Sequence, residues 1–207
     1  MTEEHPTFPM TVYGASKLAG ESYTRAYYRT YGFPAVVVRP FNAYGPRCHH
    51  EGDSGEVIPR FLLRCMAGLP MVVFGDGTQT RDFTFVWDTA RGILLAGLSD
   101  DAVGETINIG SGFEVSINDL AHHVSLAVGR PDAPVTHEQS RPGDVLRHCA
   151  DIRKARDLLE FETQIPFHEG LAVLKDWYNS CGQSPEQLLQ NEVTHNWKQP
   201  GKSAHAS

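Results

Sequence analysis

A run of apolar residues from Ala35 to Val38 constrains the fold of this chain more than any other feature. Three of the four residues are valines, whose β-branched side chains are typical of strands, and no side chain in the run is polar. A strand that is buried on both faces is typical of a parallel sheet with helices on each side. Pro40 ends the strand, and open α/β sheets bind ligands at the carboxyl edge. The sequence therefore predicts an α/β protein whose candidate site follows residue 40.

A long helix is predicted before this strand, over residues 12–31. Small and apolar side chains recur there at three- and four-residue steps, which is the helical period. Thr11 is suited to cap its start, and residues 32–34 (Gly-Phe-Pro) are typical of a helix end. Tyr13 and Lys17 lie four residues apart near the start, so both side chains are expected to project from the same face.

The rest of the chain alternates helical and extended patterns. Ser116 and Asp151 are each suited to cap a following helix. From Gly182 onward the chain is polar with few apolar anchors, which predicts a loose tail over residues 182–207. Further helices are predicted at 56–67, 88–98, 117–128, 152–161 and 167–180. Extended segments are predicted at 71–74, at 78–86 after a Gly-Asp-Gly turn, and at 106–109 before a Gly-Ser-Gly turn.

The bulk composition argues against several classes of function. The net charge is −7, and without a basic stripe we expect no binding to nucleic acid or to an anionic membrane. No apolar run approaches the roughly 20 residues that span a bilayer, and the first residues lack the layout of a signal peptide. The four cysteines form no C-x-x-C pair, which indicates reduced thiols in a cytoplasmic protein. Adjacent histidines, as in the two His-His pairs, point in different directions, so we expect no metal site.

The spacing of Tyr13 and Lys17 suggests acid/base chemistry. A phenol is a weak base at neutral pH unless its phenolate is stabilised, and a lysine ammonium one helical turn away stabilises it. The first turn of a helix also favours negative charge. Such a tyrosine could take a proton from a hydroxyl while a cofactor takes the hydride. Tyrosine and lysine at this spacing are also common by chance in helices, so the pair alone is a weak signal.

Five segments, in order along the chain, give this pair a wider context. They read VYGASKLAGE, VVVRPFNAYGPR, VFGDGTQTRDFTFVWDTARGILLA, NIGSG and RPGDVLRHCADIRKA. Together they resemble the extended short-chain dehydrogenase/reductase family, and within it the NAD-dependent sugar-nucleotide epimerases and dehydratases. The resemblance covers residues 8–178. It implies the C-terminal part of a Rossmann-like, doubly wound parallel sheet and a small mixed α/β substrate-binding domain.

The resemblance also implies a reaction and a cofactor. Tyr13 would be the catalytic acid/base, and Lys17 would hold the nicotinamide ribose hydroxyls of NAD. Pro40 and Phe41 would lie where the strand end meets the nicotinamide. The reaction would begin with hydride transfer from a sugar carbon and pass through a 4-keto sugar. We favour a nucleotide-sugar 4-epimerase, with dTDP-glucose 4,6-dehydratase and UDP-glucuronate decarboxylase as alternatives.

A nucleotide-diphosphate sugar is the implied substrate, and guanidinium groups suit its diphosphate because they form paired hydrogen bonds. Arg81 and Arg141 would bind the diphosphate, and Asp144 would lie near the nucleotide ribose. Each arginine could instead be an exposed ion-pair partner, and the Pro-Asn sequence could be a turn that ends the strand. The implied substrate-binding residues are Asn42 near the diphosphate, Val73 and Phe74 at the base, Arg81, Arg141 and Asp144.

The resemblance divides the chain into domains. Residues 1–55 would form the back end of the Rossmann-like domain, and residues 56–181 mostly the substrate-binding domain, with 84–112 returning to the Rossmann-like sheet. The family's N-terminal cofactor-binding half, with its glycine-rich turn, is absent from this sequence. We therefore expect the chain alone to bind NAD weakly and to turn over little substrate. A homodimer is expected for the full-length protein rather than for this piece. The alternative is a non-catalytic remnant that binds a sugar nucleotide or a partner subunit.

Overall fold

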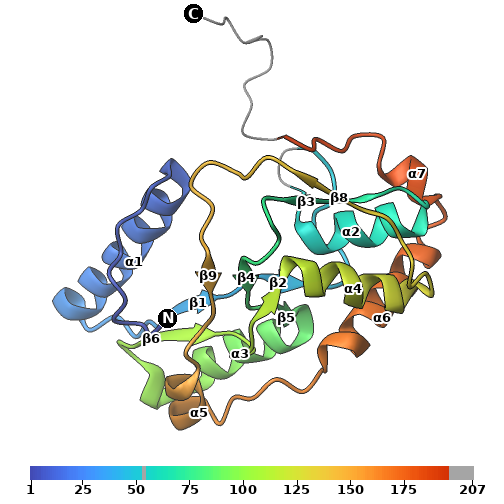
Figure 1. Cartoon of the computed structure of the whole chain (residues 1–207). Helices are drawn as coiled ribbons and strands as arrows, with labels where there is room; N and C mark the ends of the chain where they lie inside the picture. Colours follow the sequence, from blue (N-terminus) through green and yellow to red (C-terminus); the bar gives the residue numbers. More distant parts are fainter. Residues whose placement is uncertain (53–54, 196–207) are drawn as a thin grey trace, which may run out of the picture. The chain divides into compact units, whose positions relative to one another are not determined.

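The computed structural model describes residues 1–52 and 55–195 (Figure 1). It has the α/β architecture that the sequence predicts, with helices packed on parallel strand pairs. The chain divides into two compact units, each built from three segments. Unit 1 comprises Met1–Ala43, Arg81–Glu114 and His148–Pro166, and unit 2 comprises Tyr44–Thr80, Val115–Arg147 and Phe167–Ser207.

The elements follow the predicted order closely. The helices are α1 (Val12–Tyr31), α2 (Val57–Met66), α3 (Val86–Leu98), the 3-10 helix η1 (Asp100–Ala102), α4 (Ile117–Val128), α5 (Arg153–Leu159), α6 (Phe167–Ser180) and α7 (Pro185–Leu188). The strands are β1 (Val37–Pro40), β2 (Ala43–Tyr44), β3 (Met71–Phe74), β4 (Thr80–Arg81), β5 (Thr84–Phe85), β6 (Thr106–Ile109), β7 (Val115–Ser116), β8 (Val135–Glu138) and β9 (Arg147–His148). Within the described residues, no helix is both long and apolar enough to cross a membrane.

Local signals in the sequence determine the ends of several helices. The Thr11 side chain accepts a hydrogen bond from the Gly14 backbone N–H, which confirms the predicted cap of α1. Gly32 ends α1 with φ of 65°, a left-handed conformation that glycine adopts without strain. Ser116 caps α4 by accepting from the Asp119 backbone N–H, also as predicted. The prediction that Asp151 caps α5 is wrong by one residue, because the N-cap is Ile152 and has no side-chain cap. Asp151, one residue earlier, accepts a hydrogen bond from the Arg153 backbone N–H.

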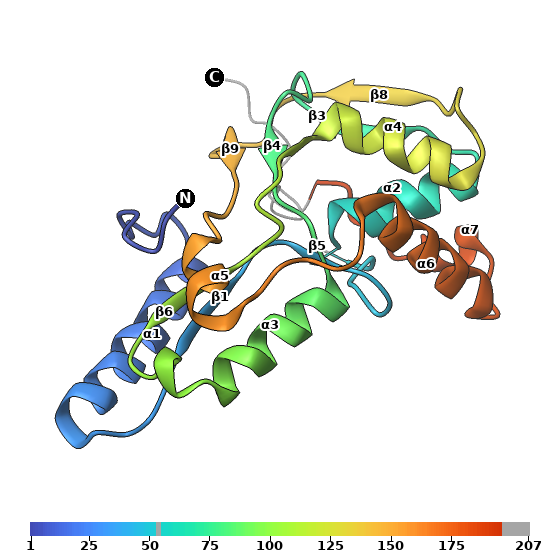
Figure 2. The same cartoon turned by 90° about the horizontal axis from the view of Figure 1, so that it is seen from below.

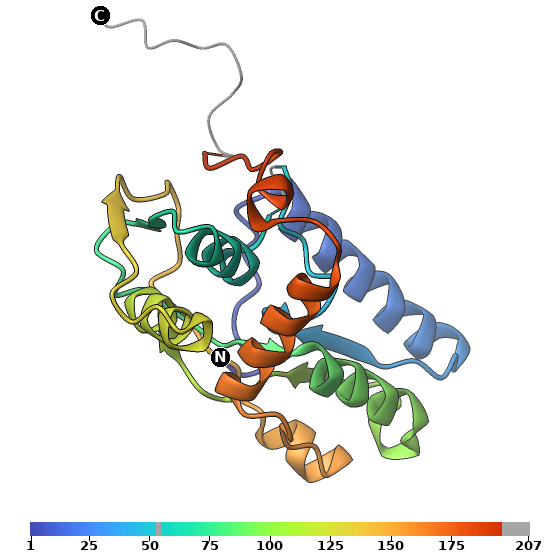
Figure 3. The ribbon, with the colours of Figure 1, turned by 90° about the vertical axis from the view of Figure 1, so that its right-hand side faces the viewer.

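Unit 1 is built on a parallel pair of strands, β1 and β6, in which Val37 pairs with Thr106. The helices α1 and α3 lie on opposite sides of β1 (Figure 3). The strand starts two residues after the predicted Ala35, and Val37 is buried while Val38 is half-buried. The predicted parallel strand between two helices is therefore confirmed, although its burial is less complete than the apolar run suggests.

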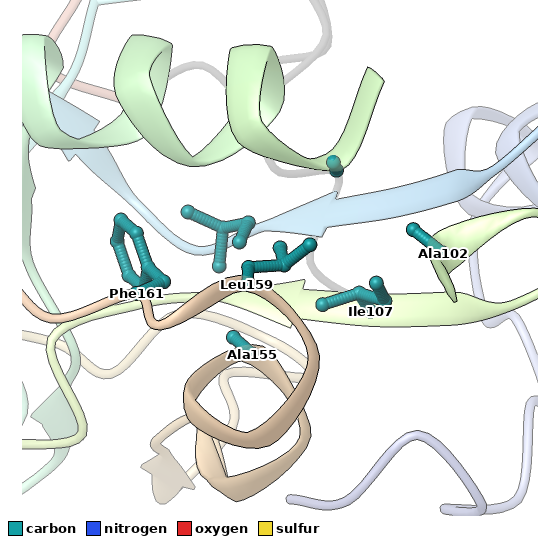
Figure 4. Packing of buried hydrophobic residues seen from close by; sticks show 7 residues of the cluster. Ala102, Ile107, Ala155, Leu159 and Phe161 are labelled. Carbon is teal, nitrogen blue, oxygen red and sulfur yellow. The ribbon is translucent and has the colours of Figure 1, made fainter. Parts of the chain in front are cut away.

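The core of unit 1 lies between β6, α3 and α5. Ile107 and Ile109 of β6 and Ala155 of α5 are fully buried, and Phe161 is buried beside them (Figure 4). Gly92 of α3 permits this packing, because a Cβ atom there would lie 2.7 Å from Cγ2 of Ile109. The missing side chain therefore allows α3 to approach the sheet closely.

An ion cluster ties α1 to the end of β1. The Arg39 guanidinium donates two hydrogen bonds to the two carboxylate oxygens of Glu21, each 2.8 Å long. Arg25, one turn further along α1, donates to the same carboxylate and also to Oγ1 of Thr106 at the start of β6. The Arg39 hydrogen bonds hold the pKa of Glu21 below its usual value.

We expect Glu21→Gln to lower the free energy of unfolding by about 2 kcal/mol at pH 7, because the variant leaves the largely buried Arg39 without its carboxylate. Above the ordinary glutamate pKa, the carboxylate is charged in both states and stabilises the fold fully. As the pH falls through that value towards the lowered folded value, this contribution is lost. Urea titrations at pH 7 and pH 4 should therefore show a smaller difference between wild type and variant at pH 4. Glu169→Gln, at an exposed position on α6, is the control.

Unit 2 is built on a second parallel pair, β3 and β8, which α2 and α4 cover (Figure 2). Met71 and Val73 of β3 are buried, whereas Phe74 is half-buried. The alternation is that of a strand with one covered face and one more exposed face. In the register, Phe74 pairs with Glu138.

The segment after Gly182 contains more structure than a polar tail. Ser184 and Gln187 form a reciprocal capping box at the start of α7. Glu192 pairs with Arg64 of α2 at 2.7 Å, and both side chains are largely buried. This pair and α7 anchor the segment against α2. Residues 196–207 of the predicted tail lie outside the described residues.

Candidate active site

Tyr13 and Lys17 lie at the end of α1 that extends past the carboxyl end of β1. Glu21 marks the place where α1 meets Arg39, next to the last residue of β1. Lys17 and Tyr13 follow one and two turns closer to the helix N-terminus, or about 6 and 12 Å along the axis at 1.5 Å per residue. Both side chains are exposed, Tyr13 to 71%. The predicted pair therefore lies beyond the strand end, at the sheet edge where α/β proteins bind ligands.

The two side chains lie on the same face of α1. Nζ of Lys17 lies 5.2 Å from the centre of the Tyr13 ring, as the four-residue spacing predicts. The ammonium therefore lies against the Tyr13 ring as a cation–π contact. An exposed ammonium beside a phenol also offers the donors that ribose hydroxyls accept, so the two residues fit the nicotinamide ribose of NAD.

The residues that follow β1 contact a histidine that the sequence analysis did not single out. Phe41 is 7% exposed, and its ring stacks on that of His148 with centroids 4.6 Å apart. The Asn42 side chain is exposed, and its amide nitrogen lies 3.3 Å from Nδ1 of His148. The same nitrogen donates to the Asp82 carbonyl at 2.8 Å. Because an amide nitrogen only donates, His148 accepts at Nδ1 and carries its proton on Nε2.

Burial lowers the pKa of His148, and the nearby positive charge of Arg81 lowers it further. The ring is therefore neutral at pH 7, the form in which Nδ1 accepts from Asn42. Protonation would place a second proton-bearing nitrogen against the Asn42 amide. The contacts at the strand end thus depend on a neutral imidazole.

We expect the stability of the folded chain to fall as the pH drops below the ordinary histidine value of about 6.5. In that range His148 is protonated in the unfolded chain but remains neutral in the folded chain, because its pKa is lowered there. Acid therefore favours unfolding. His148→Phe keeps a ring on Phe41 and cannot be protonated. Melting curves between pH 7.5 and 5.5 should show a shallower decline for this variant. An unchanged slope would contradict the role given to His148.

Asp82 connects the loops around this strand end. Its side chain is fully buried, and its carboxylate accepts hydrogen bonds from three backbone N–H groups, those of Ser111, Gly112 and Ala150, at 2.8 to 3.1 Å. The Ser111 hydroxyl donates to the same carboxylate at 2.6 Å. Asp82 also donates its own backbone N–H to the carbonyl of His148. One buried carboxylate thus fixes the Gly-Ser-Gly turn after β6 and the segment that carries His148.

The remaining predicted residues fall in the two units as follows. Pro40 is exposed at the end of β1, and Arg81 is half-buried in the same unit as Tyr13. Val73, Phe74, Arg141 and Asp144 belong to unit 2. The structure brings two of these together, because the Arg141 guanidinium carbon lies 5.1 Å from the centre of the Phe74 ring.

The side chain of Val73 is not available to contact a base. Its side chain has no exposed surface, because it belongs to the face of β3 that α2 and α4 cover. Only its backbone could reach a ligand. The half-buried Phe74, whose side chain points to the other face, is better placed for that contact.

The comparison with known families decides the ancestry of the chain. The profile of the family described as NAD dependent epimerase/dehydratase matches residues 1–110, just over half of the chain. The chain belongs to this family. The match includes Tyr13, Lys17 and the strand end at Pro40.

Individual members of the epimerase/dehydratase family match beyond residue 110. A UDP-glucose 4-epimerase from Mycolicibacterium smegmatis is 35% identical over 182 residues, which are 88% of this chain and 57% of the relative. A dTDP-glucose 4,6-dehydratase from Neisseria gonorrhoeae is 35% identical over 188 residues, which are 86% of this chain and 53% of the relative. The chain thus spans about half the length of the curated relatives that it matches.

Solved structures of the family share the fold. The UDP-glucose 4-epimerase of Thermotoga maritima, crystallised with UDP-glucose, is 31% identical with a TM-score of 0.81. The match covers 86% of this chain and 57% of that structure. An epimerase from Methanothermobacter thermautotrophicus is 38% identical with a TM-score of 0.80. These neighbours are Rossmann-fold enzymes, so the two units correspond to part of that architecture.

Proposed function

We propose that these 207 residues carry the catalytic tyrosine–lysine pair and the substrate-binding part of an NAD-dependent nucleotide-sugar 4-epimerase. The observation that carries this proposal is the position of the Lys17 ammonium, 5.2 Å from the Tyr13 ring on an exposed face beyond the end of β1. Membership of the epimerase/dehydratase family supports it.

The residues at the strand end suggest how the chain would act on a sugar hydroxyl. Lys17 would stabilise the Tyr13 phenolate, which would accept the hydroxyl proton and later return it. Bound NAD would supply a reversible hydride acceptor. Asn42 donates its amide protons to Asp82 and His148, so its amide oxygen is oriented as an acceptor for a substrate hydroxyl.

The substrate would be a nucleotide-diphosphate sugar. Arg81 and Arg141 would bind the diphosphate, Asp144 would lie near the ribose, and Phe74 would contact the base. The aromatic ring beneath Arg141 supports this assignment, because it holds the guanidinium in a fixed orientation. A homodimer is part of the proposal for the whole protein.

An assay with UDP-, dTDP- and GDP-sugars and NAD would test the function. Because the chain spans about half of its relatives, it should be assayed both alone and joined to the preceding half of a relative. A product inverted at C4 would support an epimerase. A 4-keto-6-deoxy product would indicate a dehydratase, and release of carbon dioxide a decarboxylase. The absence of any product or 4-keto intermediate in the joined protein would overturn the catalytic proposal and favour a non-catalytic remnant.

A further inference from the structure

A group of side chains in unit 2 connects the C-terminal segment to the ring of Phe74. Phe74 and Glu138 are register partners in the parallel strands β3 and β8, so their side chains lie side by side on one face. Nε2 of His195 donates to the Glu138 carboxylate at 2.6 Å. The His195 ring lies edge-on to Phe74, with centroids 5.7 Å apart.

The position of His195 follows from anchors earlier in the segment. Glu192, three residues before it, pairs with Arg64 of α2, and Gly52 donates its backbone N–H to the carbonyl of Asn191. Figure 1 shows the segment after α7, in red, running back towards β3 and β8. These contacts bring a residue far along the chain to the exposed face of the β3–β8 pair.

The Phe74 ring therefore contacts two groups of complementary chemistry. The Arg141 guanidinium lies over the ring at 5.1 Å, and the His195–Glu138 pair lies at its edge. A guanidinium attracts an anionic group, and a carboxylate accepts from an N–H group. A nucleoside diphosphate of the uracil type carries both, since its diphosphate is anionic and its planar base has one imide N–H.

We propose that Glu138, oriented by His195, accepts a hydrogen bond from the imide N–H of a uracil-type base that lies against Phe74. The C-terminal segment thereby becomes part of the nucleotide site. This inference rests on the proposed function, because it places the base of the sugar nucleotide at Phe74. It adds to that site Glu138 and His195, two residues that the motifs of the sequence do not mark.

The full chain titrated with UDP and with N3-methyl-UDP tests this contact. N3-methylation removes the imide proton, so wild type should bind UDP about tenfold more tightly than the methylated nucleotide. Glu138→Ala should abolish that preference. His195→Ala, and also His195→Phe, which keeps a ring on Phe74, should each weaken UDP binding by about tenfold. His168→Ala, at an exposed position on α6, should bind UDP like wild type.

The outcomes separate this inference from the proposed function. If wild type binds UDP and the Glu138 and His195 variants bind it equally well, the inference is wrong and the sugar-nucleotide proposal stands. If His195→Ala binds UDP more tightly, the segment obstructs the site, and the inference is again wrong. If wild type binds neither UDP nor dTDP, both the inference and the proposed substrate fail. Melting temperatures of the variants, compared with wild type, show whether each one is folded.

Discussion

Replacing Asp82 by asparagine is expected to lower the free energy of unfolding by about 4 kcal/mol, the largest effect on stability that we predict. The wild-type carboxylate is fully buried and accepts from the backbone N–H groups of Ser111, Gly112 and Ala150. An asparagine amide has one acceptor oxygen, and its NH₂ group would face at least one of these donors. A small domain is stable by about 5–15 kcal/mol, so the variant loses a large part of that margin.

Urea unfolding at neutral pH would measure this loss. Asp157→Asn is the matched control, because Asp157 is an exposed aspartate on α5 in the same unit. We expect the control to change the unfolding free energy by less than about 0.5 kcal/mol. If both variants unfolded at the same urea concentration, the role of Asp82 in joining the loops around the strand end would be refuted.

Replacing Tyr13 by phenylalanine is expected to lower kcat by about a hundredfold to ten-thousandfold, the range of positioned acid/base groups. The same fall in kcat is expected in any polypeptide that contains these residues and converts a sugar nucleotide. Tyr13 is 71% exposed, so loss of its hydroxyl should leave the fold intact. KM should change little, because the hydroxyl acts on the proton rather than on substrate affinity.

Tyr23→Phe provides a control on the same helix. Tyr23 is 70% exposed and lies ten residues after Tyr13 on α1. It should retain wild-type kcat. Lys17→Met should lower kcat as well, since it removes the ammonium that would stabilise the phenolate in the proposed reaction. Equal turnover by the Tyr13 and Tyr23 variants would remove Tyr13 from the reaction.

The sequence predicts best the features that depend on neighbours along the chain. The Thr11 cap, the Ser116 cap and the Tyr13–Lys17 contact each involve residues three or four positions apart. Their geometry follows from the helical repeat alone. The parallel strand at Val37 was also predictable, because its apolar run has few alternatives.

Features that depend on distant partners were not predictable. In the sequence, Asp82 is one polar residue next to Arg81. No neighbouring residue indicates that its carboxylate accepts a hydrogen bond from Ala150, 68 positions away. His148 and His195 likewise acquire their partners only through the fold. The burial of the Val73 side chain, by contrast, follows from the alternation of side chains along β3.

The interleaving of the two units limits how this protein can be dissected. Each unit is assembled from three separate stretches, so the polypeptide passes from one unit to the other five times. No single cut in the gene would release either unit intact. Attempts to graft the substrate preference of one family member onto another would therefore have to exchange several stretches together, or the whole 207-residue block.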